Sequence, residues 1–286
     1  MFAEPKLEFV NSTIHKGFIV KTQNSPGTAL ITGASSGIGA VYADRLARRG
    51  FDLILVARNR GRLDELATRL AHDTGRRVDV VAADLTLTAD LRRVEERLRS
   101  QASITLLVNN AGIGATAPLI DSAPEQLETM IQLNVIALTR LTRAVVPAFA
   151  ARGHGAIINI ASIAALSQEL LNGSYSGTKA YVVTFSQSLH HELDKKGVQI
   201  QAVLPGAIRT EFWDVAGLPV ANLPHEIVMS AEDLVDAALA GFDARELITI
   251  PSLPDAADWA RFDAARLVMV PQLSRTKAAP RYAAAA

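Results

Sequence analysis

The 286-residue sequence contains no cysteine. Disulfide bonds, thiolate metal ligands and a cysteine nucleophile are therefore excluded. Net charge is also absent, because 29 basic residues balance 29 acidic ones, so no overall field attracts nucleic acid or an anionic membrane. The six histidines are scattered without ligand spacing, and consecutive side chains in His190-His191-Glu192 would point about 100° apart on a helix. We expect no metal, no nucleic-acid partner and no membrane partner.

The distribution of charged and apolar residues predicts neither a secretory leader nor a membrane span. Glu4 and Glu8 interrupt the N-terminal apolar residues, and no cationic start precedes them. The longest charge-free run, 100–120, contains Asn109, Asn110 and Pro118, which favours a buried strand that runs into a loop. These features predict a soluble protein of a reducing compartment, the cytoplasm.

What the sequence does have is a regular alternation of β-branched runs and amphipathic stretches from Thr28 onward, typical of parallel α/β folds. The predicted strands are Thr28–Thr32, Leu53–Val56, Val78–Val81, Leu106–Val108, Ala156–Ile160, Gln199–Leu204 and Leu247–Ile250. The predicted helices are Gly37–Arg49, Arg60–Ala71, Thr88–Arg99, a long helix opening with a capping box at Ser122-Ala123-Pro124-Glu125, Ser174–Lys195 and Ser230–Phe242.

Hydrophobic residues make up 49% of the chain and charged residues 20%, enough for one large core. We predict a single domain over residues 28–270. Residues 1–27 do not fit the alternation and are interpreted as an N-terminal arm or tail. The Ala-rich end, 271–286, is interpreted as a C-terminal tail.

A glycine-rich turn, Thr32-Gly33-Ala34-Ser35-Ser36-Gly37-Ile38-Gly39, follows the first strand and opens the first helix. Free N–H groups at the helix start and closely approaching glycine backbone favour a bound phosphate. A tight strand–helix connection is the simpler interpretation. The same residues match the nucleophile elbow Gly-x-Ser-x-Gly of α/β hydrolases, in which Ser35 and a histidine such as His225 would act together.

A second group of polar residues lies further along the chain. Ser162 closes the fifth strand, and Tyr175 and Lys179 lie four residues apart on the helix that follows. Side chains at this spacing share one helix face, about 5–6 Å apart. The ammonium is expected to lower the tyrosine pKa from about 10 toward neutrality. Such a tyrosine suits proton transfer at the oxygen of a carbonyl that gains or loses a hydride.

Together these motifs resemble the short-chain dehydrogenase/reductase family over about Thr28 to Ile250. The resemblance implies a doubly wound parallel sheet (Rossmann fold) of seven strands in the order 3-2-1-4-5-6-7, with the cofactor at the switch between strands 1 and 4. It implies four catalytic residues: Tyr175 as acid/base, Ser162 binding the substrate oxygen, Lys179 holding the nicotinamide ribose, and Asn134 positioning a water. The implied cofactor-binding residues are Gly33, Ser35, Ser36, Gly37, Ile38, Gly39, Arg58, Asp84, Asn110, Ala111, Gly112, Tyr175, Lys179, Pro205, Gly206, Ile208 and Thr210.

The end of the second strand predicts which cofactor is bound. NAD-preferring enzymes of this fold usually place an acid there, whereas this chain has Ala57 followed by Arg58, which suits a 2′-phosphate. Many NADP-preferring relatives carry a further basic residue where Ser36 stands. NADP(H) is the predicted cofactor and NAD(H) the alternative.

The segment 207–229 corresponds to the family's substrate lid. Apolar residues in and near it favour an aromatic, alicyclic or long-chain carbonyl substrate; they are Phe212, Trp213, Val215, Leu218, Val220, Leu166, Leu170 and Leu171. Reduction of 3-oxoacyl groups on acyl carrier protein is the alternative activity, and an NADP-sensing regulator on the same fold is the alternative outside catalysis.

The helices that carry Asn134 and Tyr175 predict a homodimer or homotetramer. We expect their apolar residues to be too numerous for burial against one sheet; they are Leu133, Val135, Ile136, Leu138, Leu141, Val145, Val146, Tyr181, Val182, Phe185 and Leu189.

Overall fold

The computed structural model describes residues 26–282, within which seven strands form one parallel sheet. Their order across the sheet is β3 (Val78–Ala82), β2 (Asp52–Ala57), β1 (Thr28–Thr32), β4 (Ile104–Asn109), β5 (Gly155–Ile160), β6 (Val198–Val203) and β9 (Ile248–Thr249). This confirms the doubly wound α/β fold and its strand order. The strand order reverses between β1 and β4, which places a crevice at the carboxyl ends of these two strands.

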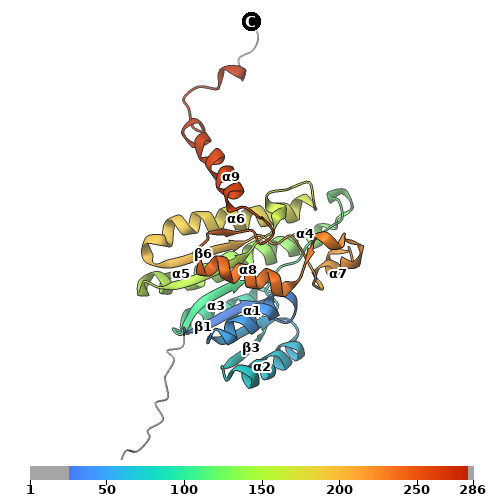
Figure 1. Cartoon of the computed structure of the whole chain (residues 1–286), viewed down its shortest axis with the longest axis vertical. Coiled ribbons are helices and arrows are strands. Elements are labelled where there is room, and N and C mark those ends of the chain that lie inside the picture. Colours follow the sequence, from blue (N-terminus) through green and yellow to red (C-terminus); the bar gives the residue numbers. More distant parts are fainter. Residues whose placement is uncertain (1–25, 283–286) are drawn as a thin grey trace, which may run out of the picture.

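Helices cover both faces of the sheet (Figure 1). One face carries α1 (Gly37–Arg48), α2 (Arg60–Thr74) and α8 (Ala231–Asp243), and the other carries α3 (Thr88–Ser100), α5 (Leu138–Arg152) and α6 (Gly173–Leu193). Because both faces are covered, the middle strands are apolar on both sides, and β1 is buried throughout.

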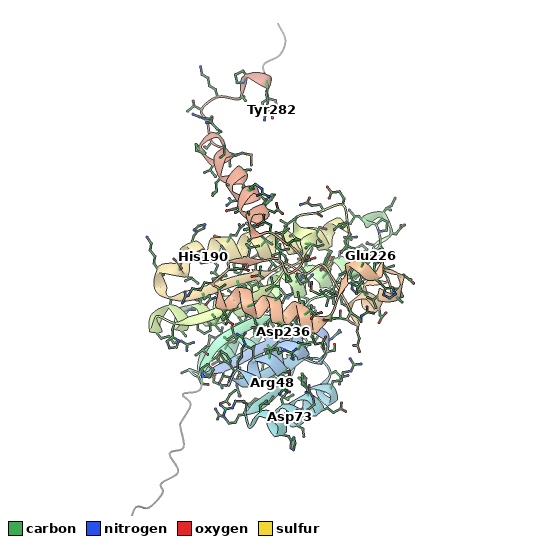
Figure 2. The ribbon with its side chains drawn as sticks, in the orientation of Figure 1. Arg48, Asp73, His190, Glu226, Asp236 and Tyr282 are labelled. Atoms are coloured by element: carbon green, nitrogen blue, oxygen red, sulfur yellow. The ribbon has the colours of Figure 1, made fainter. Side chains whose placement is uncertain are left out.

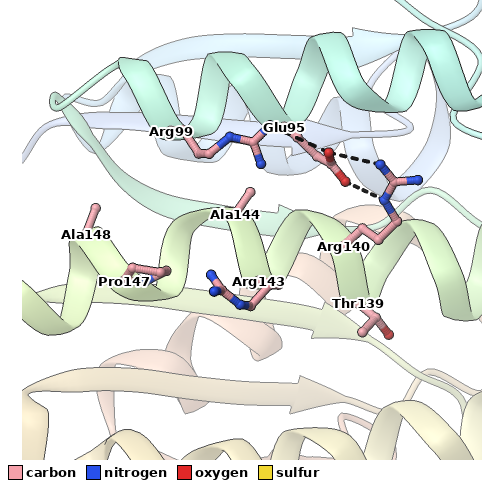
Figure 3. Close-up of a pocket in the computed structure, with 8 residues that line it drawn as sticks. All are labelled: Glu95, Arg99, Thr139, Arg140, Arg143, Ala144, Pro147 and Ala148. Atoms are coloured by element: carbon pink, nitrogen blue, oxygen red, sulfur yellow. Dashed lines mark hydrogen bonds and ion pairs between the residues drawn. The ribbon is translucent and has the colours of Figure 1, made fainter.

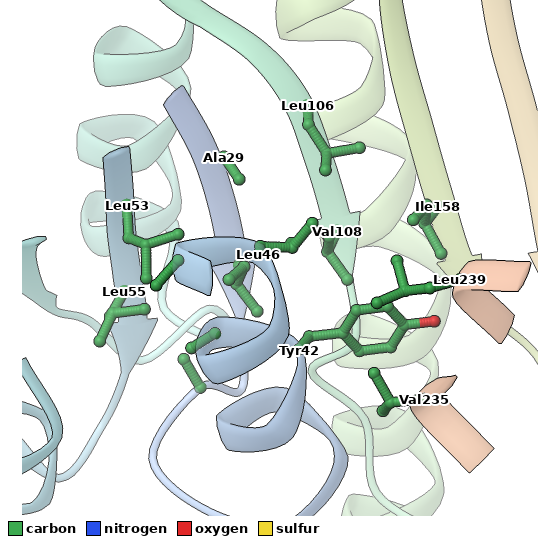
Figure 4. Close-up of a cluster of buried hydrophobic side chains, with 14 of the residues drawn as sticks. Ala29, Tyr42, Leu46, Leu53, Leu55, Leu106, Val108, Ile158, Val235 and Leu239 are labelled. Atoms are coloured by element: carbon green, nitrogen blue, oxygen red, sulfur yellow. The ribbon is translucent and has the colours of Figure 1, made fainter. Parts of the chain in front are cut away.

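The first of these two layers is anchored by Tyr42 and Leu46 of α1, which pack between the sheet and α8 (Figure 4). Tyr42 is fully buried, and Val235 and Leu239 of α8 lie beside its ring. The core therefore holds the start of α1, and with it the glycine-rich turn, firmly against the sheet.

The long apolar helix predicted from Ser122 differs from its prediction in two ways. α4 (Pro124–Ile131) begins at the proline without a side-chain cap, because the Ser122 hydroxyl instead donates to the Pro118 carbonyl at 2.9 Å. The predicted capping box is therefore wrong, although the proline does stand in the first turn. A π-helical turn, Gln132–Ala137, then joins α4 to α5.

The helical run 124–152 is long and apolar enough to cross a membrane, the one such run in the described part of the chain. Its side chains Leu141, Val145 and Phe149 are buried against the sheet, as in the core helix of a globular domain.

Short elements around residues 207–229 were not predicted. β7 (Ala207–Ile208) pairs in parallel with β8 (Val228–Met229), and α7 (Phe212–Ala216) lies between them. Two-residue strands carry too little periodicity to be recognised in a sequence. Short 3₁₀ turns occur at Leu119–Asp121, Ile163–Ala165, Asp194–Lys196, Val220–Asn222, His225–Ile227, Val270–Gln272 and Pro280–Tyr282.

The C-terminal part contains a helix that was also missed. α9 (Ala256–Met269) projects from the body of the domain and has no buried residue (Figure 1). Trp259, at its base, packs against the cluster around Val182 and Ile248. The predicted arm or tail at residues 1–27 lies almost wholly outside the described residues.

Candidate active site

The glycine-rich turn has the backbone that a bound phosphate requires. Gly33 and Gly37 have φ angles of 65° and 52°, a region that residues with a side chain rarely adopt. α1 begins at Gly37, and its first turn has neither an acidic residue nor a side-chain cap. Its free N–H groups and the positive end of the helix dipole therefore point toward the crevice.

Close packing explains the other glycine. A Cβ on Gly39 would overlap the carbonyl oxygen of Gly33 and lie 2.6 Å from the Asn110 amide nitrogen. That same nitrogen donates to the Thr32 carbonyl at 2.9 Å and to the Gly33 carbonyl at 3.2 Å. The end of β4 thus holds the turn in shape, and a backbone cradle at a helix start fits the pyrophosphate of a dinucleotide.

The crevice extends past the end of β2, where Arg58 is exposed and makes no ion pair within residues 26–282. Arg62, one turn into α2, instead forms a 2.7 Å ion pair with Glu211 of the lid segment. This pairing and a hydrogen bond with Ser36 hold the pKa of Glu211 below its usual range. Arg58 therefore offers an exposed cation at the end of β2, and its contact with a 2′-phosphate stays a prediction.

Asp84 has a structural task besides its predicted cofactor contact. Its carboxylate accepts hydrogen bonds from the Thr86 backbone N–H at 3.0 Å and from the Thr86 hydroxyl at 2.7 Å. These bonds shape the turn between β3 and α3.

Ser162, Tyr175 and Lys179 are brought together at the carboxyl end of β5. Ser162 follows the strand and hydrogen-bonds to Tyr175, which stands in the first turn of α6. The Asn172 side chain caps this helix by accepting from the Ser174 N–H at 2.8 Å. Lys179 donates from Nζ to the Ile160 carbonyl at 2.9 Å, and Nζ lies 5.7 Å from the centre of the Tyr175 ring.

The predicted lowering of the tyrosine pKa is wrong for this structure. Burial raises the pKa of Tyr175 to about 12, and the hydrogen bond with Ser162 opposes the shift without overcoming it. Burial also lowers the pKa of Lys179 to about 8. The sequence pattern revealed the neighbouring ammonium but not how completely the two side chains are removed from water.

Asn134 lies in the π-helical turn, and its unusual position inside a helix has a direct explanation. Its amide pairs with the backbone of Ile113, accepting from N–H at 3.0 Å and donating to C=O at 2.9 Å, and it also donates to the Thr178 hydroxyl at 3.1 Å. Gly112 borders both Asn134 and Lys179, since a Cβ there would lie 3.1 Å from Oδ1 of the former and 3.6 Å from Nζ of the latter. Asn134 therefore positions the loop after β4; its predicted role toward a water stays a prediction.

The segment after β6 closes the crevice from the other side. The Pro205 carbonyl accepts from the Ile163 N–H at 2.9 Å, next to Ser162. Thr210 lies over Gly37, where a Cβ would come within 3.0 Å of its methyl group. Thr210, on the predicted nicotinamide side, thus lies directly against the glycine-rich turn.

The predicted apolar lining is present only in part. Phe212 and Leu171 join the cluster around Tyr175, whereas Leu166 packs into a different cluster and Leu170 is 59% exposed. Trp213 is buried and donates from its ring nitrogen to the Ile208 carbonyl at 2.9 Å. It anchors the lid rather than lining a substrate space.

Sequence reasoning missed three residues at this site. Ile113 and Thr178 hold Asn134 through its amide, and Glu211 ties the lid to α2. Backbone contacts such as those of Ile113 leave no signal in residue type. The charges of Arg62 and Glu211 were visible, but 149 residues separate them in the chain.

No group of three or more histidine, cysteine, aspartate or glutamate side chains in the part of the chain that the structure describes could hold a metal. His190 lies on the outer side of α6, away from the crevice (Figure 2). The arrangement is that of a proton-transfer site beside a dinucleotide cradle.

Comparisons with known proteins agree with this geometry. Residues 27–217 match the short chain dehydrogenase family. The very-long-chain 3-oxoacyl-CoA reductase of Anas platyrhynchos is 35% identical over 195 residues, which cover 66% of this chain and 62% of the relative. The 17-beta-hydroxysteroid dehydrogenase type 3 of Homo sapiens is 35% identical over 64% of this chain and 59% of its own length. The chain thus spans about three fifths of these curated relatives.

Solved structures are more similar still. A short-chain dehydrogenase from Sphingobium yanoikuyae in complex with NADPH is 50% identical, with a TM-score of 0.87 over 90% of this chain and 99% of that one. A bulky-bulky ketone specific alcohol dehydrogenase from Comamonas testosteroni is 45% identical, with a TM-score of 0.84 over 91% and 99%. The hydrolase interpretation of Ser35 is therefore wrong, since the turn that contains it is the glycine-rich turn of a dehydrogenase. The chain belongs to the short-chain dehydrogenase/reductase family.

Proposed function

We propose that this protein is an NADP-dependent oxidoreductase that transfers hydride between the nicotinamide and a carbonyl or secondary alcohol. The observation that carries the proposal is the placement of Ser162, Tyr175 and Lys179 beside the glycine cradle. When bound, the reduced nicotinamide would supply the hydride to the carbonyl carbon, and the carbonyl oxygen would take a proton.

Tyr175 supplies that proton from its hydroxyl group. Its raised pKa keeps the hydroxyl protonated at neutral pH, which is the state that reduction of a carbonyl requires. The Ser162 hydroxyl, which is hydrogen-bonded to Tyr175, would orient the carbonyl oxygen of the substrate. Lys179 lies under the ring at the end of β5 and faces the side where the nicotinamide ribose would be held.

Arg58 supports NADP(H) over NAD(H). Its guanidinium is exposed at the end of β2, and a similar protein of known structure was solved with NADPH. An L-sorbose reductase from Gluconobacter frateurii, 32% identical, was also solved with NADPH and L-sorbose. NADP(H) binding is proposed for this chain on both grounds.

An apolar ketone is the proposed substrate class. Tyr175 belongs to a cluster of apolar side chains, and one similar enzyme is named for bulky-bulky ketones. Reduction of a 3-oxoacyl group is supported by the names of other relatives. An acyl carrier protein needs a cationic docking patch, however, and the exposed charges of the lid include Glu211, Asp214 and Glu226 against Arg209. We therefore propose ketones that are not attached to an acyl carrier protein as the substrates.

Turnover of a ketone panel with NADPH and with NADH, followed by absorbance of the reduced cofactor, tests the proposal. We expect turnover of aryl and alicyclic ketones with NADPH. Absence of turnover on every ketone and alcohol, with the cofactor still bound, would favour the cofactor-sensing regulator. Turnover confined to acyl thioesters would favour the 3-oxoacyl alternative.

We also propose a homodimer or homotetramer that is formed through α5 and α6. The apolar side chains that were predicted to be too numerous for one sheet do not need a partner, because the protomer itself buries Leu138, Leu141, Val145, Val182 and Leu189. What supports the proposal is the remaining exposed face. Ile136 and Tyr181 are 39% and 36% exposed, and the Tyr181 hydroxyl bonds to Thr139 of α5 at 2.7 Å.

The neighbouring groove between α3 and α5 extends this face (Figure 3). Glu95 and Arg140 join the two helices through hydrogen bonds of 2.5 and 3.0 Å, and Arg143 and Pro147 line the groove beside them. Light scattering of wild type and of Ile136→Asp tests the proposal, with Leu273→Asp on the C-terminal segment as control. A dimer that survives Ile136→Asp but not Leu273→Asp would place the interface elsewhere.

The cytoplasm remains the proposed location. Fractionation of cells that express the full-length chain tests it, and recovery in the membrane fraction would overturn it.

A further inference from the structure

The tip of the Phe212 ring lies directly against the backbone of Gly114. A Cβ on Gly114 would overlap Cζ of Phe212 and lie 3.0 Å from Cε2 and 3.1 Å from Cε1. Gly114 does not have a positive φ, so its backbone conformation is open to any residue. The ring of Phe212 alone accounts for the need for glycine at this position.

The same ring covers the proton donor. The centres of the Phe212 and Tyr175 rings are 5.9 Å apart at an interplanar angle of 50°. Phe212 joins a cluster in which Met130, Ala164 and Tyr175 are buried and Leu171 is partly buried. Tyr175 is 5% exposed, and the Phe212 ring is one of the side chains that surround it. Phe212 therefore lies where a substituent of the substrate would lie when its carbonyl oxygen meets the Tyr175 hydroxyl.

The segment that carries Phe212 is fastened on both sides of it. Trp213 is buried and bonded to the Ile208 carbonyl, while the Ala216 carbonyl accepts hydrogen bonds from both the N–H and the hydroxyl of Thr116. Phe212 itself is only half-buried and is held by ring contacts alone. Rotation of this side chain would therefore not require α7 to unfold.

We propose that Phe212 and Gly114 are specificity-determining residues, and that the Phe212 ring occupies a ring-sized apolar subsite that a flat substituent of the ketone takes over. This inference rests on the proposed function and names the substrate class of that same site. A phenyl or cyclohexyl ketone regains the contacts with Gly114 and the cluster that the displaced ring gives up. A small alkyl ketone displaces the ring without regaining them, so the site discriminates against it.

Two variants test the two residues in different ways, with acetophenone and cyclohexyl methyl ketone compared against 2-butanone. Phe212→Ala removes the ring that small ketones must displace, and we expect kcat/KM for 2-butanone to rise at least about tenfold. Gly114→Ala fills the floor of the subsite and also pushes the Phe212 ring from its place, so we expect kcat/KM for the ring ketones to fall at least about tenfold relative to that for 2-butanone. Phe262→Ala, on the exposed α9, and Gly61→Ala, where a Cβ meets only ordinary contacts, are the matched controls.

A second measurement does not depend on turnover. The Trp213 and Phe212 rings meet edge to face with centres 5.6 Å apart, and Trp259 is the only other tryptophan. In Trp259→Phe/Tyr175→Phe with NADPH, we expect cyclohexyl methyl ketone to shift Trp213 emission in a saturable way. Adding Gly114→Ala should weaken that binding at least about tenfold.

The outcomes distinguish a failure of the proposed function from a failure of the proposed Phe212–Gly114 subsite. If wild type reduces none of the ketones, the proposed function fails. If wild type reduces them and the ratio of ring to small ketones stays the same in Phe212→Ala and Gly114→Ala, the subsite is wrong. Unchanged Trp213 emission at ketone concentrations that saturate turnover would overturn the displacement of Phe212. Thermal unfolding of each variant shows whether a loss reflects folding instead.

Discussion

The ammonium of Lys179 lies 5.7 Å from the centre of the Tyr175 ring and is held there by its hydrogen bond to the Ile160 carbonyl. Both side chains are more than nine-tenths buried, Tyr175 at 5% and Lys179 at 7% exposed. Burial disfavours the charged form of each group. It therefore raises the pKa of Tyr175 to about 12 and lowers the pKa of Lys179 to about 8. Activity and stability should therefore respond differently to pH.

Replacing Tyr175 with phenylalanine removes the proton donor and keeps the ring packing. We expect kcat to fall by about 10²- to 10⁴-fold, the usual contribution of general acid catalysis. The Kd for NADPH, measured by quenching of protein fluorescence, should change little, because the hydroxyl is directed at the substrate. Wild-type kcat on a true substrate would show that another group donates the proton.

Lys179 makes the stability of the fold depend on pH. Its pKa is lowered from 10.5 to about 8 in the folded protein, so between these values the unfolded chain holds a proton that the folded chain has released. Stability contributed by this residue therefore rises with pH across that window, by at most about 1.4 kcal/mol per pH unit. Below pH 8 the charged, buried ammonium is a constant penalty.

Urea unfolding of wild type and Lys179→Met from pH 7.5 to 9.5 measures this effect. We expect the variant's stability advantage to shrink as pH rises, whereas the exposed Lys195→Met control should show a constant difference from wild type. The series stops below pH 10 because Tyr175, with its raised pKa, destabilises the folded state above that value. A pH-independent difference for Lys179→Met would contradict the prediction.

Arg58 should discriminate between the two nicotinamide cofactors. A charge-assisted hydrogen bond contributes about 1.5–3 kcal/mol, so we expect Arg58→Ala to weaken NADPH binding by about 10- to 150-fold. NADH binding should be almost unchanged, because it has no 2′-phosphate. Titration calorimetry with both cofactors measures the difference. Arg60→Ala is the control, since Arg60 is already paired with Asp64 at 2.9 Å. Equal losses for NADPH and NADH would assign Arg58 to another part of the cofactor.

Tyr42 places its hydroxyl group in the core. Its oxygen is buried between the sheet and α8 and has no hydrogen-bond partner among residues 26–282 (Figure 4). A buried polar group without a partner destabilises a protein by about 1–3 kcal/mol, so Tyr42→Phe should raise the free energy of unfolding by about 1 kcal/mol or more. Urea unfolding measures the change, and Tyr181→Phe, whose hydroxyl is bonded to Thr139, should instead be neutral or destabilising. A loss of stability in Tyr42→Phe would show that the hydroxyl has a partner in solution.

Much of the fold was predictable because it rests on local patterns. The seven strands that run through the sheet, the start of α1 at Gly37 and the cap of α8 are periodic or are marked by a residue type. Ser230, for instance, begins the helix predicted from it and accepts from the Asp233 N–H at 2.9 Å. The capping box at Ser122 failed because the same hydroxyl found a nearer carbonyl at Pro118. Local rules hold only where no tertiary partner competes.

The catalytic candidates followed from the sequence because a strand end, a turn and one helix face carry them. Gly33, Gly37, Ser162, Tyr175 and Lys179 each occupy a position that short-range geometry places at the carboxyl edge of the sheet. Their proximity needs no more than the parallel order of β1, β4 and β5. The resemblance to a known family then supplied the roles.

The tertiary structure alone decided how these groups behave. Whether Tyr175 has a lowered or a raised pKa depends on how much water reaches it, and that depends on side chains from several elements, Phe212 among them, 37 positions further along the chain. Whether Gly114 can bear a side chain depends on the same distant ring. Sequence periodicity reports which residues lie on one face of an element, because that is set by backbone geometry over a few residues. Solvent exclusion and steric fit arise only between elements, so the sequence by itself determined the fold and the chemical groups, and packing decided their pKa values and the space left for a substrate.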